Sequence, residues 1–570
     1  MSPLLSHSIT RRDFLAGAAA AALLSRAALG ERSTASSAAG QLGPESSDID
    51  ADLIEVGIPA LRAFYTAKRY TATQVTRWYL DRIARYNPVY RAVIHVDAAG
   101  ALATAAALDA AAQQGGSAAQ RGPLWGVPIV IKANTSVKGL VTSAGWSGYL
   151  IPGKELIAPA DAHVVAKLRA AGAIILGQTN MPDFAASDTN YSSAFGRTGN
   201  AYNVRYSPGG SSGGTVTAVT ANFAVFGTGT DTSNSIRMPS GTSDVVGMLP
   251  TRGLVSIAGI QPLDWLLDDT GPIARTVTDV AIALTVMAGE DPMDFRTVGS
   301  AARAQPGPYT NYLNKDALKG KRFGVPAFIV PEGNGEGAGG PPLEPDTRAR
   351  FMTALDGLRA AGATVVIDEG ILPPSFVGLV GAIKTRPYVG EGTEAFLREF
   401  GPAAYHSPRE YALAVGAPLP ATVTGVGGAT PAGAPAAAPV HIENDPQAEA
   451  NVWAPQRAAL AAYDDTCARF QLDGMVYPAI QMPPNDEIQV LLEGHRSAGP
   501  HSATGWVNPI GIPAIVVPAG FYASGLPFGL EFSGKRWKDG DLLGAAFAFE
   551  QATKLRKPPV LVDTVPTPPG

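Results

Sequence analysis

The sequence predicts an α/β fold in which helices cover both faces of a sheet. A β-branched run at Ile129–Ile131 is followed by a helical stretch at 161–172 and by a second apolar run at 173–180. The same order of helix, glycine and apolar strand returns at 346–368. Apolar strands that alternate with helices are typical of a sheet buried on both faces.

Helical periodicity dominates the first part of the chain, from 51 to 114. Apolar side chains in 71–88 fall mostly on one stripe, so we expect a helix that begins at an N-cap of Thr71 or Thr73 and stops at Pro88. The later elements expected are helices at 215–227, 277–289 and 445–470 and strands at 322–328, 474–479 and 512–521.

One large domain is expected at 49–560, because no linker separates two cores. The Pro/Gly/Ala-rich stretch at 418–439 is interpreted as a surface insertion within that domain. A net charge of −5 at pH 7 provides no electrostatic basis for nucleic-acid binding. The single cysteine, Cys467, excludes an internal disulfide, and the seven histidines form no HExxH-like pair. We therefore expect neither a metal nor another cofactor.

Residues 1–30 resemble a twin-arginine export signal. Arg11 and Arg12 precede a short apolar run, and small residues follow at 27–30. The apolar run is too short to span a bilayer, so no stable membrane insertion is expected. We expect an exported protein, periplasmic or secreted, with a disordered Ser/Ala/Gly-rich lead-in at 31–48. The alternative is a cytosolic protein with a basic tail.

Lys132 directly follows the apolar run that ends at Ile131. A lysine in this position is drawn toward the interior, where burial disfavours the ammonium and lowers the pKa of the side chain. A neutral amine can serve as a general base near neutral pH. The alternative is a lysine at a strand end whose ammonium reaches solvent.

Two stretches rich in serine follow Lys132. The first, SPGGSSGG at 207–214, contains GxSxG. No convincing strand precedes it and no Gly-Lys-Ser/Thr follows, so neither a nucleophile elbow nor a phosphate loop is indicated. The second, GTDTSNSIRMPSG at 229–241, can converge its backbone N–H groups on an anionic intermediate near Ser235. The alternatives are an ordinary glycine–serine loop for the first and a polar N-cap for Ser235.

Together these segments resemble the amidase signature family. The segments GVPIVIK, PGGSSGG and GTDTSNSIR stand in the family's order, and Ser211 and Ser235 have the spacing of its two catalytic serines. GQTNMPDFA, DDTGPIARTVTDVA, NPIGIPAIVVPAGF and GLPFGLEFSG also look like family segments, so the resemblance covers residues 50–555. It implies a single large α/β/α sandwich with a twisted mixed central sheet. The implied reaction is hydrolysis of carboxylic amides, and family members also cleave esters, anilides and carbamates.

The resemblance also assigns roles to residues. Ser235 is the nucleophile, and Ser211, at a cis peptide bond, links it to Lys132, which acts as the base. The backbone N–H groups of the implied oxyanion hole belong to Thr232, Ser233 and Asn234, together with Ser235. The implied supporting hydrogen-bond shell consists of Ser212, Asp231 and Arg237. Lysine thus takes the base role that histidine has in other serine hydrolases.

Three residues depart from the family pattern. Ser233 and Asn234 stand where glycines are usual, which leaves the geometry of the oxyanion hole open. If either position has a positive φ, asparagine tolerates it better than serine. Gln178 replaces the lysine of GKTN and is expected to be structural.

The signature does not specify the substrate. Met181 and Asp183 are candidate substrate-binding residues, while Phe376, Tyr388 and Phe396 are candidate pocket walls or core side chains. We expect a small-molecule or peptide amide with a neutral or apolar acyl group, cleaved by a monomer or homodimer. Two alternatives are open: the glutamine-hydrolysing subunit of a tRNA-dependent amidotransferase, and an exported ligand-binding protein on an inactive scaffold.

Overall fold

The computed structural model describes residues 46–114, 122–330, 343–425, 440–492 and 499–564. Contacts group the chain from Leu53 to Gly570 into one compact unit. The predicted export signal and most of the predicted lead-in lie outside the described residues, and helix α2 (Ser46–Leu53) covers the end of the lead-in. No helix in the described ranges is both long and apolar enough to cross a membrane.

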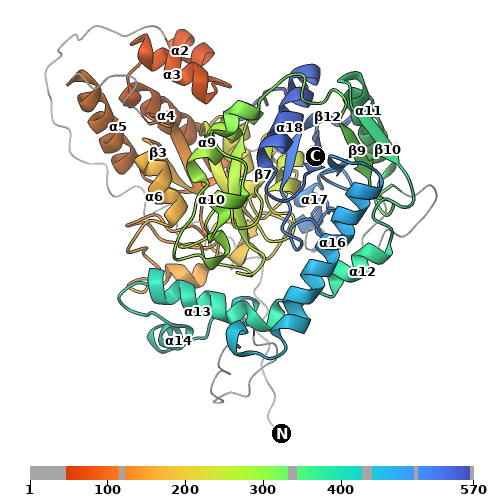
Figure 1. The fold of residues 1–570 in the computed structure, drawn as a ribbon. Helices are drawn as coiled ribbons and strands as arrows, with labels where there is room; N and C mark the ends of the chain where they lie inside the picture. The colour runs from red at the N-terminus through yellow and green to blue at the C-terminus, as the bar shows by residue number, and fades with distance from the viewer. Residues whose placement is uncertain (1–45, 115–121, 331–342, 426–439, 493–498, 565–570) are drawn as a thin grey trace, which may run out of the picture. The chain divides into compact units, whose positions relative to one another are not determined.

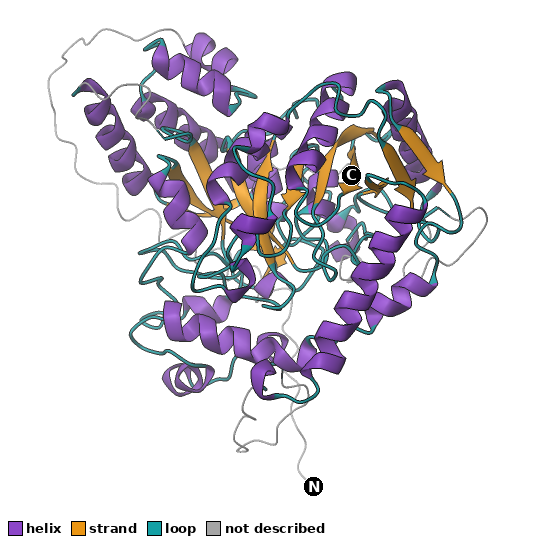
Figure 2. Cartoon of the chain, viewed as in Figure 1, coloured by secondary structure: helices purple, strands orange, loops and turns teal. Residues whose placement is uncertain are grey.

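A mixed sheet of 11 strands forms the centre of the unit that begins at Leu53, in the order β1-β3-β2-β6-β8-β7-β12-β13-β11-β9-β10 (Figure 1). Helices lie along the faces of this sheet (Figure 2). Strand β2 is parallel to β3 and β6, and β9 is parallel to β10 and β11, whereas the other pairs are antiparallel. The predicted α/β fold with a helix-flanked mixed sheet is confirmed.

The strands of the large sheet are β1 (Val93–Val96), β2 (Pro128–Lys132), β3 (Ile174–Thr179), β6 (Phe226–Asp231), β7 (Val246–Leu249), β8 (Asp269–Ala274), β9 (Arg322–Val325), β10 (Thr364–Ile367), β11 (Gly474–Pro478), β12 (Ala514–Phe521) and β13 (Pro527–Ser533). A separate small sheet pairs β4 (Tyr191–Ser192) with β5 (Gly196–Arg197).

The helices of this unit are α3 (Ile58–Thr66), α4 (Ala72–Tyr90), α5 (Ala98–Gln113), α6 (His163–Ala170), α7 (Gly213–Thr220), α8 (Arg237–Gly241), α9 (Val277–Met287), α10 (Ser300–Arg303), α11 (Pro345–Ala360), α12 (Ser375–Gly381), α13 (Val389–Phe400), α14 (Pro408–Val415), α15 (Ala421–Thr424), α16 (Ala454–Arg469), α17 (Glu487–Leu492) and α18 (Asp539–Thr553). Helix α15 lies in the first part of the predicted insertion, whose residues 426–439 are outside the described residues.

Helix α4 shows why one predicted boundary holds and the other does not. Thr71 is the N-cap: its hydroxyl accepts a hydrogen bond from the N–H of Gln74, and the Gln74 side chain accepts one from the N–H of Thr71. The predicted stop at Pro88 is wrong, because the helix continues to Tyr90 and ends at Arg91, which has a φ of 51°. Pro88 lies in the last turn, where its missing N–H removes only one intrahelical hydrogen bond.

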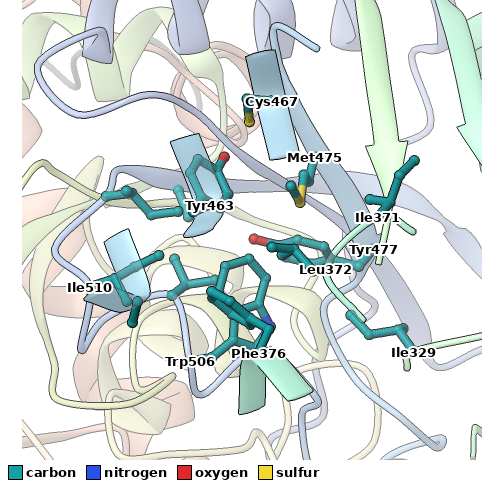
Figure 3. Packing of buried hydrophobic residues seen from close by; sticks show 14 of the residues in the cluster. Ile329, Ile371, Leu372, Phe376, Tyr463, Cys467, Met475, Tyr477, Trp506 and Ile510 are labelled. Atoms are coloured by element: carbon teal, nitrogen blue, oxygen red, sulfur yellow. The ribbon is translucent and has the colours of Figure 1, made fainter. Parts of the chain in front are cut away.

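The aromatic side chains considered as pocket walls lie in the hydrophobic core. Phe376 packs edge-to-face on Trp506, with ring centroids 5.4 Å apart, inside a cluster that also includes Tyr477 and Ile510 (Figure 3). Tyr388 and Phe396 are buried in two other apolar clusters. Core packing, the alternative considered for these three residues, is therefore what the structure shows.

Candidate active site

The sheet brings Lys132 and the two serine-rich stretches together. Lys132 is the last residue of β2, and Asp231 is the last residue of the parallel neighbouring strand β6. Ser211 and Ser212 lie immediately before helix α7, which packs on both β2 and β6. Because parallel strands end at the same edge of the sheet, this edge and the start of α7 form one site.

Lys132 is completely buried and surrounded by oxygen atoms. Its Nζ lies 2.7 Å from Ser211 Oγ, 3.0 Å from Ser212 Oγ and 2.8 Å from Thr230 Oγ1. Burial lowers the pKa of Lys132 to about 7, although the nearby carboxylates of Asp231 and Asp268 act in the opposite direction. The side chain is therefore poised between ammonium and free amine at neutral pH.

Ser211 follows a cis peptide bond to Gly210, as the family resemblance implied. Gly210 lies directly against the backbone of a neighbouring loop: a Cβ at this position would be 2.4 Å from the carbonyl oxygen of Thr189. The next residue, Ser212, donates its backbone N–H to the carbonyl oxygen of Ser235 at 3.2 Å. This bond joins the Ser211 loop to the residues 232–236, which we call the nucleophile loop.

The nucleophile loop is folded around the carboxylate of Asp231. Asp231 accepts hydrogen bonds from the backbone N–H of Ile236 at 3.0 Å and from Arg237 Nε at 3.2 Å. Arg237 also donates to the carbonyl oxygen of Ser233. Ser235 is 6% exposed, and within the described residues its hydroxyl has no hydrogen-bond partner. That hydroxyl is therefore free to meet a substrate.

Arg237 is fully buried between two carboxylates. Its second partner is Glu531 on β13, whose Oε1 lies 2.6 Å from Arg237 Nη1. Burial alone lowers the pKa of Arg237, but Asp231 and Glu531 outweigh this effect and raise it above its ordinary value. Burial raises the pKa of Glu531 to about 7 despite the pairing with arginine. The arginine thus remains charged and connects the nucleophile loop to the C-terminal half of the sheet.

The comparisons with known proteins agree with this geometry. The family model described as Amidase matches residues 74–384, more than half of the chain. The chain belongs to the amidase signature family. This membership makes the protein a serine hydrolase that acts on the C–N bond of amides.

Individual relatives of this amidase cover almost its whole length. A glutamyl-tRNA(Gln) amidotransferase subunit of Azoarcus sp. (strain BH72) is 31% identical, over 88% of this chain and 98% of that protein. The peptide amidase from Stenotrophomonas maltophilia is 30% identical, with a TM-score of 0.71 over 89% of this chain and 99% of its own. A bacterial aryl acylamidase with 21% identity and a TM-score of 0.66 shares the fold.

The unusual residues of the nucleophile loop fit its backbone without a left-handed conformation. Neither Ser233 nor Asn234 has a positive φ. Ser233 is exposed, and its Oγ faces the segment around Gly505, where a Cβ would come within 2.8 Å of it. Side chains can therefore replace the usual glycines in this amidase at no conformational cost from φ.

The two candidate substrate-binding residues differ in their surroundings. Met181 is completely buried in a small cluster with Ala133, which directly follows Lys132, and partly buried Leu263 packs on the same cluster. Asp183 is half-buried, and its carboxylate accepts a hydrogen bond from the N–H of Ser193 at 2.8 Å. Met181 thus packs against the residue that follows Lys132, whereas Asp183 supports the small β4–β5 hairpin.

Gln178, which stands where the family usually has lysine, contacts the protein backbone. Its Nε2 donates to the carbonyl oxygen of Thr135 at 3.3 Å, and the side chain is completely buried. The side chain thus stabilises the turn that follows β2. This contact is consistent with the structural role expected for Gln178.

Three polar residues of the site were not identified from the sequence. They are Thr230, Asp268 and Glu531, which contact Lys132, Thr232 and Arg237 respectively. A signal existed for Glu531, which is the only charged residue in the mostly apolar strand β13. Thr230 and Asp268 belong to segments that carry the family resemblance, but nothing in the pattern showed that their side chains face inward.

Substituting Arg237 with methionine should destabilise the fold strongly. The change leaves Asp231 and Glu531 buried without their cation, and breaking a buried ion pair costs about 3–5 kcal/mol. Urea denaturation followed by circular dichroism measures the loss. Arg457→Met is the matched control, because its pair with Glu449 is exposed and worth about 0–1 kcal/mol. Equal losses in the two variants would contradict the role given to Arg237.

Proposed function

We propose that this protein is an exported amidohydrolase that cleaves a small-molecule or peptide amide through an acyl-enzyme on Ser235. The observation that carries the proposal is the buried Lys132, whose Nζ lies 2.7 Å from Ser211 Oγ. An amine with a pKa of about 7 can accept a proton at neutral pH, as catalysis by a serine without histidine requires.

In the proposed first step, Ser235 Oγ attacks the amide carbon and gives its proton to Ser211 Oγ, while Ser211 gives its own proton to the neutral Lys132. The backbone N–H groups of Thr232, Ser233, Asn234 and Ser235 are the candidates to hold the oxyanion. The next N–H along the chain, that of Ile236, is already bonded to Asp231 and is not available.

Collapse of the intermediate breaks the C–N bond. The proton returns from Lys132 through Ser211 to the leaving amine, which departs as ammonia or a neutral amine. Water then attacks the acyl-enzyme and gives a proton through Ser211 to Lys132. When the C–O bond to Ser235 breaks, this proton returns through Ser211 to Ser235 Oγ, and the carboxylic acid is released. Ser212 and Thr230 accept hydrogen bonds from Lys132 and keep its amine directed at Ser211 throughout.

The relatives suggest two substrate classes. Similarity to a peptide amidase over 99% of that protein supports a peptide C-terminal amide. Similarity to the glutamyl-tRNA(Gln) amidotransferase subunit favours glutamine as a second candidate, with a role in an amidotransferase complex. The export signal proposed for residues 1–30 favours the first, because a protein that serves tRNA works in the cytoplasm.

Ser235→Ala should abolish amide hydrolysis and leave the fold intact, because it removes the nucleophile and only one oxygen atom. We expect the wild type to release ammonia from a peptide C-terminal amide faster than from free glutamine. A fluorophosphonate probe, detected by mass spectrometry of the folded protein, should label Ser235 in the wild type and not in the variant. Absence of a wild-type adduct would favour a ligand-binding protein, and preference for glutamine would favour the amidotransferase alternative.

The rate of hydrolysis should rise with pH. Lys132 must be neutral, and its pKa of about 7 means that the reactive fraction grows as the pH rises through that value. We therefore expect kcat/KM for a neutral amide to increase between pH 5 and pH 8 with a midpoint of about 7. Lys132→Arg should not restore the activity lost in Lys132→Ala, since guanidinium stays protonated. A profile that is flat down to pH 5 would exclude Lys132 as the base.

Export should depend on the arginine pair. In a cell that has the twin-arginine pathway, the full chain should reach the periplasm or medium, and Arg11→Lys together with Arg12→Lys should retain it in the cytoplasm. Cell fractionation followed by an activity assay measures the distribution. Substitution of Arg26 and Arg32 by lysine is the control, because these arginines lie outside the pair. Equal export of both variants would contradict the proposed signal.

A further inference from the structure

Asp268 is a buried acid at the edge of the proposed active site. It directly precedes β8, whose first residue, Asp269, pairs with Asp231 at the end of β6. The carboxylate of Asp268 is 3% exposed. Its position therefore places it beside the strand end from which the nucleophile loop begins.

The carboxylate of Asp268 joins two segments that enclose this site. Its Oδ1 accepts the hydroxyl of Thr232, in the nucleophile loop, at 2.5 Å. Its Oδ2 accepts the backbone N–H groups of Leu263 at 2.8 Å and Asp264 at 3.1 Å. Leu263 in turn packs with Met181 on the residue next to Lys132. One side chain thus fixes the position of the nucleophile loop relative to the turn at 263–268.

Asp268 differs in its ion pairing from Asp231, the other acid near Lys132. Asp231 and Asp268 are the two carboxylates that act on Lys132. Asp231 is paired with Arg237 at 3.2 Å, so much of its charge is neutralised locally. No arginine, lysine or histidine in the described part of the chain forms an ion pair with the Asp268 carboxylate. Asp268 thus acts on Lys132 without a direct ion pair of its own, although Arg296 interacts with its charge at longer range.

We propose that Asp268 is a positioning residue that fixes the nucleophile loop through Thr232 and supplies a second negative charge, beside that of Asp231, that acts on Lys132. This inference rests on the proposed function and extends it to a residue outside the Ser235–Ser211–Lys132 relay. It assigns to Asp268 no contact with the substrate.

The ionisable groups around Asp268 belong to several elements. They are Lys132 on β2, Asp231 on β6, Asp264 within the turn at 263–268 and Asp269 at the start of β8. Arg296 also belongs to this group: it donates to the backbone carbonyl of Asp268 at 2.6 Å, interacts with the charge of Asp268 and pairs with Asp294. Burial raises the pKa of Asp268 to about 7, against the hydrogen bond from Thr232. The pKa values of Asp268 and Lys132 therefore fall in the same pH range.

Asp268→Asn is the direct test, because it keeps the shape and the acceptor oxygen and removes the charge. Without a negative charge nearby, the lysine loses its proton more readily. We therefore expect the acidic midpoint of the kcat/KM profile to move to lower pH by about half a unit or more, together with a lower kcat at the plateau. Asp539→Asn is the matched control: Asp539 is also buried and accepts a threonine hydroxyl at 2.7 Å, but it is not among the charges that act on Lys132.

Thr232 provides a second test that does not remove the acid. Thr232→Val deletes the hydrogen bond that favours ionised Asp268, so the carboxyl stays protonated to higher pH and the midpoint should again move down. Thr232→Ser keeps the hydroxyl and should retain the wild-type midpoint. These variants decide the question if Asp268→Asn does not fold.

The outcomes separate this inference from the proposed function. A wild type that hydrolyses no amide would defeat the proposed function. An active wild type whose midpoint is unchanged or raised in Asp268→Asn, or is moved equally by Asp539→Asn, would overturn the role of Asp268 alone. A downward shift in Asp268→Asn and Thr232→Val, absent from the two controls, supports it.

Discussion

The site depends on the removal of one amine from water. Lys132 ends a strand whose five residues are all buried, so its side chain has no route to solvent and must find its partners inside the protein. Hydroxyl oxygens supply these partners and satisfy the amine without forcing it to carry a charge. A carboxylate in direct contact would have kept the lysine protonated, and full hydration would have done the same. Strand β6 and the Ser211 loop provide the hydroxyl oxygens that contact this amine.

The charges of the site are organised so that the strongest pairing falls on arginine and not on lysine. Asp231 lies next to Thr230, a direct partner of Lys132, yet its carboxylate turns to Arg237 and to the N–H of Ile236. The arginine cannot lose its proton, so it holds the acid without taking part in proton transfer. Lys132 is affected only by the longer-range charges of Asp231 and Asp268, which raise its pKa against the effect of burial. Arg237 thus pairs with the acids and stays charged, while Lys132 can exchange a proton, as the proposed reaction requires.

The residues of the proposed relay could be named from the sequence because they occur in short, ordered segments that resemble those of the amidase signature family. The apolar strand before Lys132 and the glycines around Ser211 reflect burial and backbone geometry, which are visible along the chain. The sheet covered by helices followed from the alternation of strands and helices, whereas its mixed strand directions were implied by the family resemblance. Local pattern could not show which polar side chains converge from distant segments: Thr230, Asp268 and Glu531 acquire their roles only when β6, β8 and β13 lie in one sheet. It also could not separate core aromatics such as Phe376 from pocket walls, since both environments are apolar.

The pairing of Arg237 with Glu531 spans 294 positions of the chain. A growing polypeptide that has just emerged with Lys132, Ser211 and Ser235 already contains every group of the relay. It lacks the strand that balances Arg237, and this arginine is what fixes the carbonyl of Ser233. The nucleophile loop therefore reaches its final form only after β13 has been synthesised and has joined the sheet. The order that Arg237 gives to this loop is thus tied to the synthesis of β13, and a product of translation that stops before β13 contains Ser235 but lacks the second carboxylate that holds Arg237.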